Sequence, residues 1–491
     1  MADSGGTLAT LWSRAVAARA TTPSMVVQDG SGWREVGWEE ADEQVGRLAA
    51  GLHALGVARS DRVALLLRTG MEWVVSDHAL LALGAVVVPI YPTSSIGDAV
   101  HILNDSGARI LIAEPLPLAD ALLAARDDIP ALETVVGAEQ LADSDIGFDE
   151  VLVRGAELLG DSPELVEAAR AAARPDDLAT IVYTSGTTGP PKGCMLTHGN
   201  VRSQLEMIVG AGVVQPGDRT VLHLPLAHVL ARVIELMCAR LSLTLGLCHD
   251  TGRLTSALAA VRPTIFVSVP RLFETAHRAA RARVENERGF RRRIGRWAID
   301  GGLAVQRARS GGGRLGPSTR LAGRVGEKLV FTKVRERLGG ELRLAISGGA
   351  ALSGDVAEFF SAAGVPILEG YGLTEAAGVV TVNDPAHNVP GTVGRPLPGS
   401  QVELAPDGEV LIKGPHVFAG YWRSDAATRE VLGEDGWLRT GDLGRLDDGG
   451  RLVLLDRKKD IIVTASGKNV SPQNIEAALC AKPEIAQALV V

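Results

Sequence analysis

The sequence Tyr183-Thr-Ser-Gly-Thr-Thr-Gly-Pro-Pro-Lys192 has the composition of a loop that binds an anion. It follows Thr180-Ile-Val-Tyr183, a short β-branched run that is typical of a buried strand. The residues after this strand are small and rich in hydroxyls, so backbone N–H groups can approach an anion closely. Lys192 adds a point cation that can neutralise phosphate charge. The stretch therefore predicts a phosphate-binding loop.

Two other interpretations of this loop must be weighed. A plain Ser/Thr/Gly turn between two elements would have a similar composition. A P-loop would need the lysine in a Gly-Lys-Ser/Thr context, whereas Gly193 follows Lys192 here. A P-loop nucleotidase is therefore disfavoured. Cys194 lies just after the loop, but the sequence implies no base that would make it a nucleophile.

Around this loop, strand and helix patterns alternate along the chain. Residues 62–67 and 85–90 are predicted strands, and residues 71–83 between them are a predicted helix. The same alternation returns in predicted strands at 218–224, 244–248 and 264–269 and a predicted helix at 228–241. We expect an α/β fold with mostly parallel sheets flanked by helices. A length of 491 residues favours two or more domains.

Two regions depart from this alternation. Residues from about 275 to 340 are rich in arginine and predict helices joined by a flexible link at Ser310-Gly-Gly-Gly313. Residues from about 392 to 455 are rich in β patterns, with turn signals at Pro406-Asp-Gly408 and Asp447-Asp-Gly-Gly450. After residue 456 a short hairpin and a helix are expected.

Composition excludes several classes of protein. The net charge of −8 argues against a general basic field for nucleic acid. The N-terminus has no secretory pattern, and no apolar run has the roughly 18 residues of a membrane span, so a cytoplasmic protein is expected. The four cysteines form no CxxC pair or zinc-like spacing, and we expect them to be small buried residues in a reducing compartment.

The loop sequence resembles the signature of the adenylate-forming superfamily, which includes acyl-CoA synthetases, luciferases and peptide-synthetase adenylation domains. The resemblance recurs in order at Glu369-Gly-Tyr-Gly-Leu-Thr-Glu375 and Trp437-Leu-Arg-Thr-Gly-Asp-Leu443 and covers nearly the whole chain. It implies an N-terminal domain at 1–455, with layered sheets and a distorted β-barrel part. Residues 456–491 would begin a small, mobile α+β C-terminal domain. The segment Gly414-Pro-His-Val-Phe-Ala-Gly-Tyr-Trp422 matches the family but looks architectural.

Roles for individual residues follow from the resemblance. It implies that Tyr371 stacks on adenine, that Thr374 contacts the α-phosphate and that Glu375 helps to hold Mg²⁺. Asp442 would accept hydrogen bonds from the ribose hydroxyls. The implied nucleotide-contacting set is Thr184, Ser185, Gly186, Thr187, Thr188, Gly189, Lys192, Gly348, Gly349, Ala350, Glu369, Gly370, Tyr371, Gly372, Thr374, Asp442 and Arg457. The implied catalytic set is Lys192, His228, Thr374 and Glu375.

Each of these roles has a structural alternative. Glu375 and Asp442 could be solvated acids in turns, and His228 could serve only to begin a helix. Further along the chain, the resemblance makes Lys459 the hinge of the C-terminal domain and places Gly467 in a channel for the thiol. A solvated charge run is the alternative for Lys459.

The implied reaction links a carboxylic acid to AMP, with release of pyrophosphate, and then transfers the acyl group to the thiol of coenzyme A. ATP, Mg²⁺ and coenzyme A would take part, and preorganised positive charge would stabilise the first step. Such a reaction needs no protein nucleophile.

Several features resemble bacterial long-chain fatty-acid–CoA ligases. They are Pro89-Ile-Tyr-Pro-Thr-Ser-Ser95, Pro263-Thr-Ile-Phe-Val-Ser-Val-Pro-Arg271, the insertion at about 275–340, and Arg457-Lys-Lys-Asp460 with Gly467-Lys-Asn-Val470. The expected partners are therefore a long-chain fatty acid, ATP and coenzyme A, with no nucleic acid. The basic insertion could touch anionic lipid, which would associate a cytoplasmic protein with a membrane, or the phosphates of coenzyme A. A solvated helical surface is the alternative.

One family feature is missing from this sequence. The family carries a late lysine in a Gly-Lys motif that contacts the substrate during adenylation, and only 36 residues remain from position 456. Either the chain is shortened or it is deficient in adenylation, and we favour the first. An adenylation-impaired module that binds nucleotide, and an acyl-AMP ligase that loads a carrier protein, stay open as alternatives.

Overall fold

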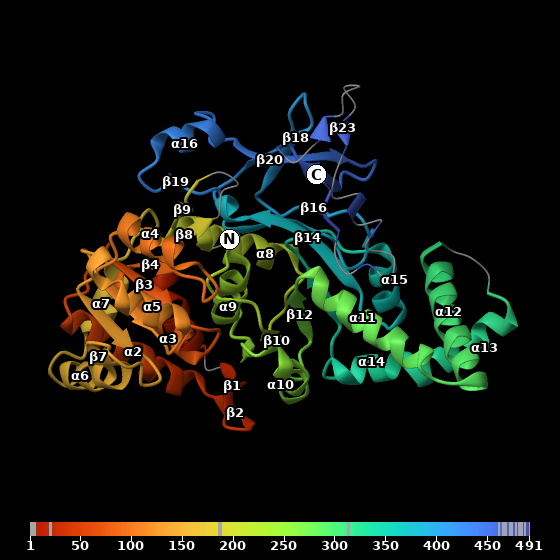
Figure 1. Cartoon of the computed structure of the whole chain (residues 1–491), viewed down its shortest axis with the longest axis horizontal. Coiled ribbons are helices and arrows are strands. Elements are labelled where there is room, and N and C mark those ends of the chain that lie inside the picture. Colours follow the sequence, from red (N-terminus) through yellow and green to blue (C-terminus); the bar gives the residue numbers. More distant parts are fainter. Residues whose placement is uncertain are drawn as a thin grey trace. The chain divides into compact units, whose positions relative to one another are not determined.

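The computed structural model describes residues 6–18, 22–184, 189–311 and 315–459, with short stretches at 462–463, 469–470, 475–476, 479, 485 and 488–490. The chain forms two compact units (Figure 1). The first comprises Met1–Ala257, Leu373–Val379 and Gly414–Leu432. The second comprises Leu258–Gly372, Val380–Lys413 and Gly433–Val491.

An eight-stranded sheet organises the first unit, in the order β19-β9-β8-β4-β3-β5-β6-β7. The six strands from β8 to β7 are parallel, whereas β9 and β19 run antiparallel to their neighbours. The bounds are β3 (Arg62–Leu66), β4 (Val86–Pro89), β5 (Ile110–Ala113), β6 (Thr134–Gly137), β7 (Ile146–Gly147), β8 (Leu178–Thr184), β9 (Lys192–Thr197) and β19 (Gly420–Tyr421). A second sheet has the order β10-β11-β1-β2, with β1 (Met25–Asp29), β2 (Gly32–Val36), β10 (Arg219–Leu222) and β11 (Thr244–Leu247).

Helices cover the sheets of the first unit (Figure 1). α2 and α6 approach each other so closely that a methyl group on Gly51 or Gly155 would collide with the backbone of the other helix. The helices are α1 (Leu11–Ala17), α2 (Trp38–Ala54), α3 (Met71–Leu83), α4 (Ile96–Ser106), α5 (Pro117–Ala124), α6 (Phe148–Asp161), α7 (Leu165–Ala172), α8 (His198–Ala211), α9 (Val229–Leu241) and α16 (Asp425–Val431), with 3₁₀ turns η1 (Leu8–Thr10), η2 (Arg126–Asp128), η3 (Thr251–Arg253) and η5 (Thr374–Ala376). α10 (Leu254–Val261) runs from this unit into the second.

Three sheets belong mainly to the second unit. The five-stranded sheet has the order β12-β13-β14-β15-β16, and the four-stranded sheet β17-β18-β20-β21 is antiparallel throughout. Their bounds are β12 (Ile265–Ser268), β13 (Leu344–Ser347), β14 (Ile367–Leu373), β15 (Gly378–Val382), β16 (Arg395–Pro396), β17 (Gln401–Leu404), β18 (Glu409–Lys413), β20 (Leu438–Leu446) and β21 (Leu452–Arg457). A short antiparallel pair joins β22 (Ile462–Val463) and β23 (Asn469–Val470).

The helices of the second unit include the arginine-rich insertion. They are α11 (Pro270–Glu285), α12 (Gly289–Gly311), α13 (Pro317–Gly326), a π-helical turn η4 (Glu327–Phe331), α14 (Thr332–Arg337) and α15 (Gly354–Ala362). α12 and α13 lie side by side (Figure 1). Glycines permit this contact, because a methyl group on Gly301 would collide with Ala322.

The α/β class predicted from the sequence is confirmed. The predicted helix at 71–83 coincides with α3, and the predicted strands match β3, β4, β10, β11 and β12 within two residues at each end. The helices predicted for residues 275–340 are also present, as α11 to α14 with η4. The β-rich stretch after residue 392 contains strands β16 to β21, although helix α16 interrupts it. The alternation did not predict hairpin β1–β2 or the antiparallel direction of β9.

Three of the four cysteines, Cys194, Cys238 and Cys248, are buried free thiols, as expected, and Cys480 lies outside the described residues. Within the part of the chain that the structure describes, no helix is long and apolar enough to cross a membrane.

His198, at the start of α8, is a fully buried titratable residue in the first unit. The Leu8 N–H donates to its Nδ1 at 3.3 Å, and its Nε2 has no hydrogen-bond partner among the described residues. Burial lowers the pKa of His198 to about 4. The unfolded chain therefore binds a proton at this position at pH values where the folded chain does not.

We therefore predict that His198 makes the protein less stable as the pH falls. Between about 6.5 and 4 the unfolded state binds more protons, so the free energy of unfolding decreases with falling pH. In urea unfolding, the free energy of unfolding of wild type should fall between pH 7 and pH 5 by about 2 kcal/mol more than that of H198Q. H53Q, at an exposed position, is the control and should leave the pH slope unchanged. Equal slopes for wild type and H198Q would contradict the prediction.

Candidate active site

The predicted phosphate loop joins two paired strands of the first unit. β8 and β9 are antiparallel, and their register places Thr184 directly opposite Lys192. The loop between them therefore leaves and re-enters the sheet at one place. Gly189 has a φ of +98°, a conformation that other residues rarely adopt, and a methyl group there would meet no atom within 4 Å. Ser185, Gly186, Thr187 and Thr188 lie outside the described residues.

Lys192 and Glu375 both contact Tyr421 at this edge of the sheet. Strand β19 pairs with β9 and sets Tyr421 opposite Cys194. The Lys192 Nζ lies 5.5 Å from the centroid of the Tyr421 ring, a cation–π contact. The Tyr421 hydroxyl donates to Glu375 Oε1 at 2.7 Å. One tyrosine thus places a cation and a carboxylate next to the loop.

Cys194 lies behind this group and does not have the surroundings of a nucleophile. Its side chain is fully buried, and its Sγ is 3.8 Å from Thr184 Oγ1. Burial, together with the charge of Glu375, raises the pKa of the Cys194 thiol well above its usual value. Because the thiolate is the reactive form, this thiol is poorly suited to covalent catalysis.

Helix α4 supports the base of the loop. The Tyr183 hydroxyl donates to Asp105 Oδ2 at 2.7 Å, and the Trp422 indole N–H donates to the Asp105 carbonyl at 2.9 Å. His101 Nε2 lies 3.0 Å from the carbonyl of Pro191. These contacts tie the end of β8, the residue before β9 and the residue after β19 to one helix, which limits how far the ends of the loop can move.

A second group of predicted site residues meets in the second unit. The Tyr371 hydroxyl donates to Asp442 Oδ2 at 2.6 Å. Asp442 in β20 pairs with Arg457 in β21, and the Arg457 Nε lies 3.4 Å from Asp442 Oδ1. Burial and the neighbouring Asp442 carboxylate raise the pKa of Tyr371, so the phenol stays protonated. The structure therefore brings together three of the residues for which the sequence predicts nucleotide contacts.

The Glu369 side chain forms hydrogen bonds with the protein backbone. Its side chain is buried, and its carboxylate accepts hydrogen bonds from the Gly391 N–H at 2.8 Å and the Leu352 N–H at 3.4 Å. Burial raises its pKa. The Leu352 bond holds the segment that follows the Gly348–Ala350 turn, where Gly349 has a φ of +84° and Ala350 is exposed. A direct contact of Glu369 with a nucleotide stays a prediction.

His228 has the structural role that the sequence offered as the alternative. It precedes α9, and its Nδ1 accepts a hydrogen bond from the Leu230 N–H at 3.1 Å. Its ring lies edge-on to Tyr91, with centroids 6.5 Å apart. The side chain is nevertheless exposed, so a further contact with a substrate stays a prediction. Lys459 is also exposed, and Gly467 lies outside the described residues.

Sequence analysis missed the part played by Tyr421. The segment from Gly414 to Trp422 looked architectural because its aromatic and glycine residues suit a strand that packs on a sheet. In the structure it also orients Glu375, since the Phe418 N–H donates to the Glu375 carbonyl at 2.9 Å. The pairing of this segment with β9, the strand that carries Lys192, could not be read from spacing alone.

The residues beside the loop suit phosphate and a divalent cation. Lys192 is exposed and forms no ion pair with the described residues, so its charge faces solvent. Among those residues, no three His, Cys, Asp or Glu side chains lie close enough to hold a metal by themselves. Glu375 supplies the hard oxygen donor that Mg²⁺ prefers, and Mg²⁺ commonly completes its coordination with water and substrate phosphates. The donor set therefore fits magnesium bound together with a nucleotide.

Comparisons with known proteins identify relatives of this chain. A family model described as AMP-binding enzyme matches residues 13–422. The long-chain-fatty-acid–CoA ligase FadD15 of Mycobacterium bovis is 42% identical over 467 residues, which cover 94% of this chain and 75% of the relative. The peroxisomal long chain acyl-CoA synthetase 7 of Arabidopsis thaliana is 34% identical and covers 90% of this chain and 64% of the relative.

Solved structures share the fold. A fatty acyl CoA synthetase of Mycobacterium tuberculosis has a TM-score of 0.69 at 25% identity, over 99% of this chain and 85% of its own. ATP-bound MatB of Rhodopseudomonas palustris has a TM-score of 0.72 at 26% identity, over 98% of this chain and 85% of its own. An anthranilate CoA ligase in complex with anthranoyl-AMP has a TM-score of 0.78 at 22% identity, over 99% of this chain and 84% of its own. This similarity supports the fold alone.

The hydrogen bond from Tyr421 to Glu375 should contribute measurably to stability. Y421F removes the donor and leaves a partly buried carboxylate oxygen without it, so we expect a loss of about 1 kcal/mol in urea unfolding. Y91F is the matched control, because the Tyr91 hydroxyl has no hydrogen-bond partner among the described residues and should lose less. Equal losses in the two variants would contradict the prediction.

Proposed function

Because the chain belongs to the AMP-binding enzyme family, we propose that it is a long-chain fatty-acid–CoA ligase. It activates the fatty acid with ATP as an acyl-adenylate and then forms the thioester with coenzyme A. Its relatives carry this activity in their names, and its fold is that of the AMP-binding ligases. The single observation that best supports the proposal is the group formed by Lys192, Tyr421 and Glu375 beside the loop.

In the first step a carboxylate oxygen attacks the α-phosphorus of ATP, and pyrophosphate leaves. Both reactants are anions, so positive charge must offset their repulsion. Lys192 and the backbone N–H groups of the loop supply that charge. Thr374, in the short turn η5, donates a hydrogen bond to the α-phosphate. The AMP group of the product is then a stable leaving group for the second step.

Glu375 holds the magnesium ion in this proposal. Its hydrogen bond from Tyr421 fixes one carboxylate oxygen, which orients the whole group. When bound, Mg²⁺ neutralises charge on the transferring phosphates. Lys192 stays over the ring of Tyr421 and forms no ion pair with Glu375 among the described residues, so both charges can meet the nucleotide.

The adenosine end of ATP uses Tyr371, Asp442 and Arg457. The Asp442 carboxylate accepts the Tyr371 hydroxyl, and a carboxylate can accept several hydrogen bonds, including those from the vicinal hydroxyls of ribose. Arg457, beside Asp442, orients that carboxylate. Tyr371 and Glu375 are only four residues apart in the chain, so one segment serves the base and the phosphates.

In the second step the thiol of coenzyme A attacks the acyl carbonyl carbon, the thioester bond forms, and the bond to AMP breaks. We assign Gly467 to the thiol channel and Lys459 to the hinge between a domain at 1–455 and a mobile part beginning at 456. His228 lies near the acyl carboxylate in this proposal. For location, we propose a cytoplasmic protein whose basic insertion at about 275–340 touches anionic lipid.

Pyrophosphate exchange tests the proposal. The full chain, given ATP, Mg²⁺ and labelled pyrophosphate, should incorporate label into ATP only when a long-chain fatty acid is added. A panel of acids of increasing length should show the highest rate with long chains. Added coenzyme A should then yield acyl-CoA. Intact ATP binding without exchange would leave only a binding module, and exchange without acyl-CoA would indicate a carrier protein as the acceptor.

Glu375 offers a test of the metal site. E375Q keeps the shape of the side chain but loses the charge, so exchange should fall at least about tenfold and require more Mg²⁺ for half-maximal rate. Y421F should raise the Mg²⁺ requirement less, because it only disturbs the orientation of Glu375. The control is E430Q, at an exposed position of α16. Unchanged Mg²⁺ dependence in E375Q would refute the assignment.

A further inference from the structure

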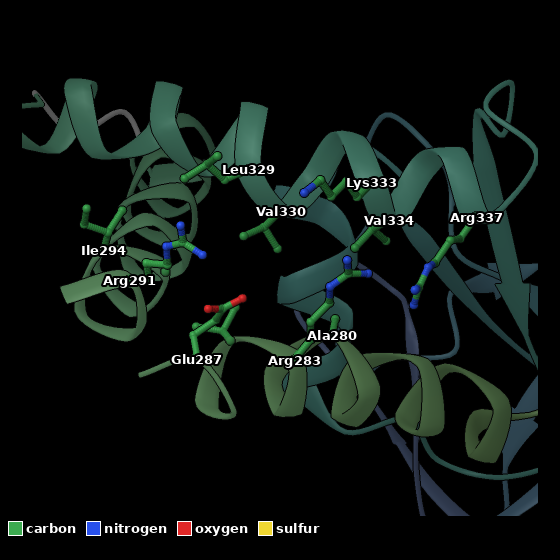
Figure 2. Close-up of a pocket in the computed structure, with 12 residues that line it drawn as sticks. Ala280, Arg283, Glu287, Arg291, Ile294, Leu329, Val330, Lys333, Val334 and Arg337 are labelled. Carbon is green, nitrogen blue, oxygen red and sulfur yellow. The ribbon is translucent and has the colours of Figure 1, made fainter. Parts of the chain in front are cut away.

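The arginine-rich insertion contains a pocket of about 340 Å³. It lies between α11, the first turns of α12, and the continuous η4–α14 segment (Figure 2). Figure 2 shows the guanidinium groups of Arg283 and Arg291 and the carboxylate of Glu287 in the space between α11 and η4. No residue assigned above to ATP, fatty acid or coenzyme A lines this pocket.

The rim of the pocket is strongly cationic. Arg283, Arg291, Lys333 and Arg337 line it, against a single carboxylate from Glu287. Within the described residues, none of these four cations forms an ion pair or a hydrogen bond. Two other arginines of the same region are paired, Arg296 with Glu285 and Arg335 with Glu327. The four rim cations therefore repel one another with only the Glu287 carboxylate in the pocket to offset them, and an anion in the pocket would relieve that repulsion.

The floor of the same pocket is apolar. Val284 and Val330 are buried in it, and Ile294 and Val334 are half-buried. A free phosphate ion would gain nothing from these side chains. A ligand with both an anionic group and hydrocarbon would use the rim and the floor together.

Large apolar side chains are exposed beside the pocket. Phe290 is 76% exposed and Trp297 41% exposed, and with Ile294 they recur at i, i+4 and i+7 on α12, which places them on one face. Leu329, on η4 at the pocket, is 45% exposed. Aromatic residues next to arginines on a helix surface are the pattern of helices that lie in the interface of a bilayer.

The distribution of charge along the chain also favours contact between the insertion and an anionic surface. Residues 275–340 contain 17 Lys and Arg and 5 Asp and Glu, a net charge of +12 in a chain whose total is −8. The rest of the chain therefore carries −20, so an anionic surface attracts the insertion and repels the remainder.

We propose that helices α11 to α14 dock on a bilayer of anionic phospholipid, with the phosphate of one lipid held in this pocket by Arg283, Arg291, Lys333 and Arg337. The apolar floor takes the glyceryl and first acyl carbons of that lipid. Phe290, Trp297 and Leu329 enter the headgroup region around it. This deepens the lipid contact in the proposed function, but it is measured as binding, so it can fail or succeed independently of ligase activity.

Vesicle cosedimentation of the full chain tests the proposal at about 0.15 M salt. Binding should be strong to vesicles of phosphatidylglycerol with phosphatidylcholine and absent with phosphatidylcholine alone. A variant in which all four rim cations become glutamine (R283Q, R291Q, K333Q and R337Q) should lose at least tenfold in affinity. The control exchanges four exposed arginines of the insertion that do not line the pocket (R292Q, R293Q, R320Q and R324Q), which removes the same charge.

The comparison of the two variants decides between a specific site and general attraction. If both lose affinity equally, the pocket is not the site and the proposal is overturned. Displacement by millimolar inorganic phosphate or glycerol phosphate would mean a site for a free anion, and tighter binding to RNA than to vesicles would mean a nucleic-acid surface. Either result would also overturn it. Thermal melting of both variants, expected to match wild type at these exposed positions, checks that folding is intact.

Discussion

The antiparallel pairing of β8 with β9 is the constraint on which the candidate site depends. A loop of small hydroxyl and glycine residues has little structure of its own, and its backbone pays a high entropic cost when it is ordered. The register that sets Thr184 opposite Lys192 fixes both ends of that loop. Contacts with Asp105 of α4 then hold Tyr183 at the end of β8 and Trp422, which follows β19. The described ends of the loop are thus held in place, which favours preorganised binding of an anion.

Strand β9 also determines where the charged side chains of the candidate site lie. β9 is bordered on its other side by β19, and this brings Tyr421 to Lys192 and Glu375. An aromatic ring with a hydroxyl can contact a cation through its face and a carboxylate through its edge, so it keeps the two near each other without an ion pair. A direct ion pair would satisfy both groups before any ligand arrived. The arrangement through Tyr421 leaves their charge for phosphate and metal.

Local sequence predicted the elements better than the contacts between them. α3 matched its prediction to the residue because an apolar run from Met71 to Leu83 is bounded by Gly70 and Gly84, and Gly84 ends the helix with a φ of +68°. The partnership of Tyr371 with Asp442 was implied only by resemblance, since 71 residues separate them. The role of Tyr421 was missed, because nothing in the segment from Gly414 to Trp422 states which strand it joins. Glu369 shows the reverse case, in which a motif residue uses its carboxylate to hold backbone N–H groups.

The uneven distribution of charge along the chain affects how the protein would approach an anionic bilayer, which the pocket alone does not. A protein with a uniform charge of −8 would be repelled by an anionic bilayer over several ångströms, since the Debye length is about 8 Å at physiological salt. A net charge of +12 is confined to residues 275–340. The attraction of the protein to an anionic bilayer therefore exceeds its repulsion only when the insertion faces the bilayer. In the proposed docking on an anionic bilayer, the field would select the orientation before any specific contact forms. The exposed Phe290 and Trp297 would act only after contact, because burial of apolar surface has a short range. The rate at which the protein associates with the bilayer should consequently depend strongly on salt concentration. The rate at which it dissociates should depend on these apolar side chains and on the pocket.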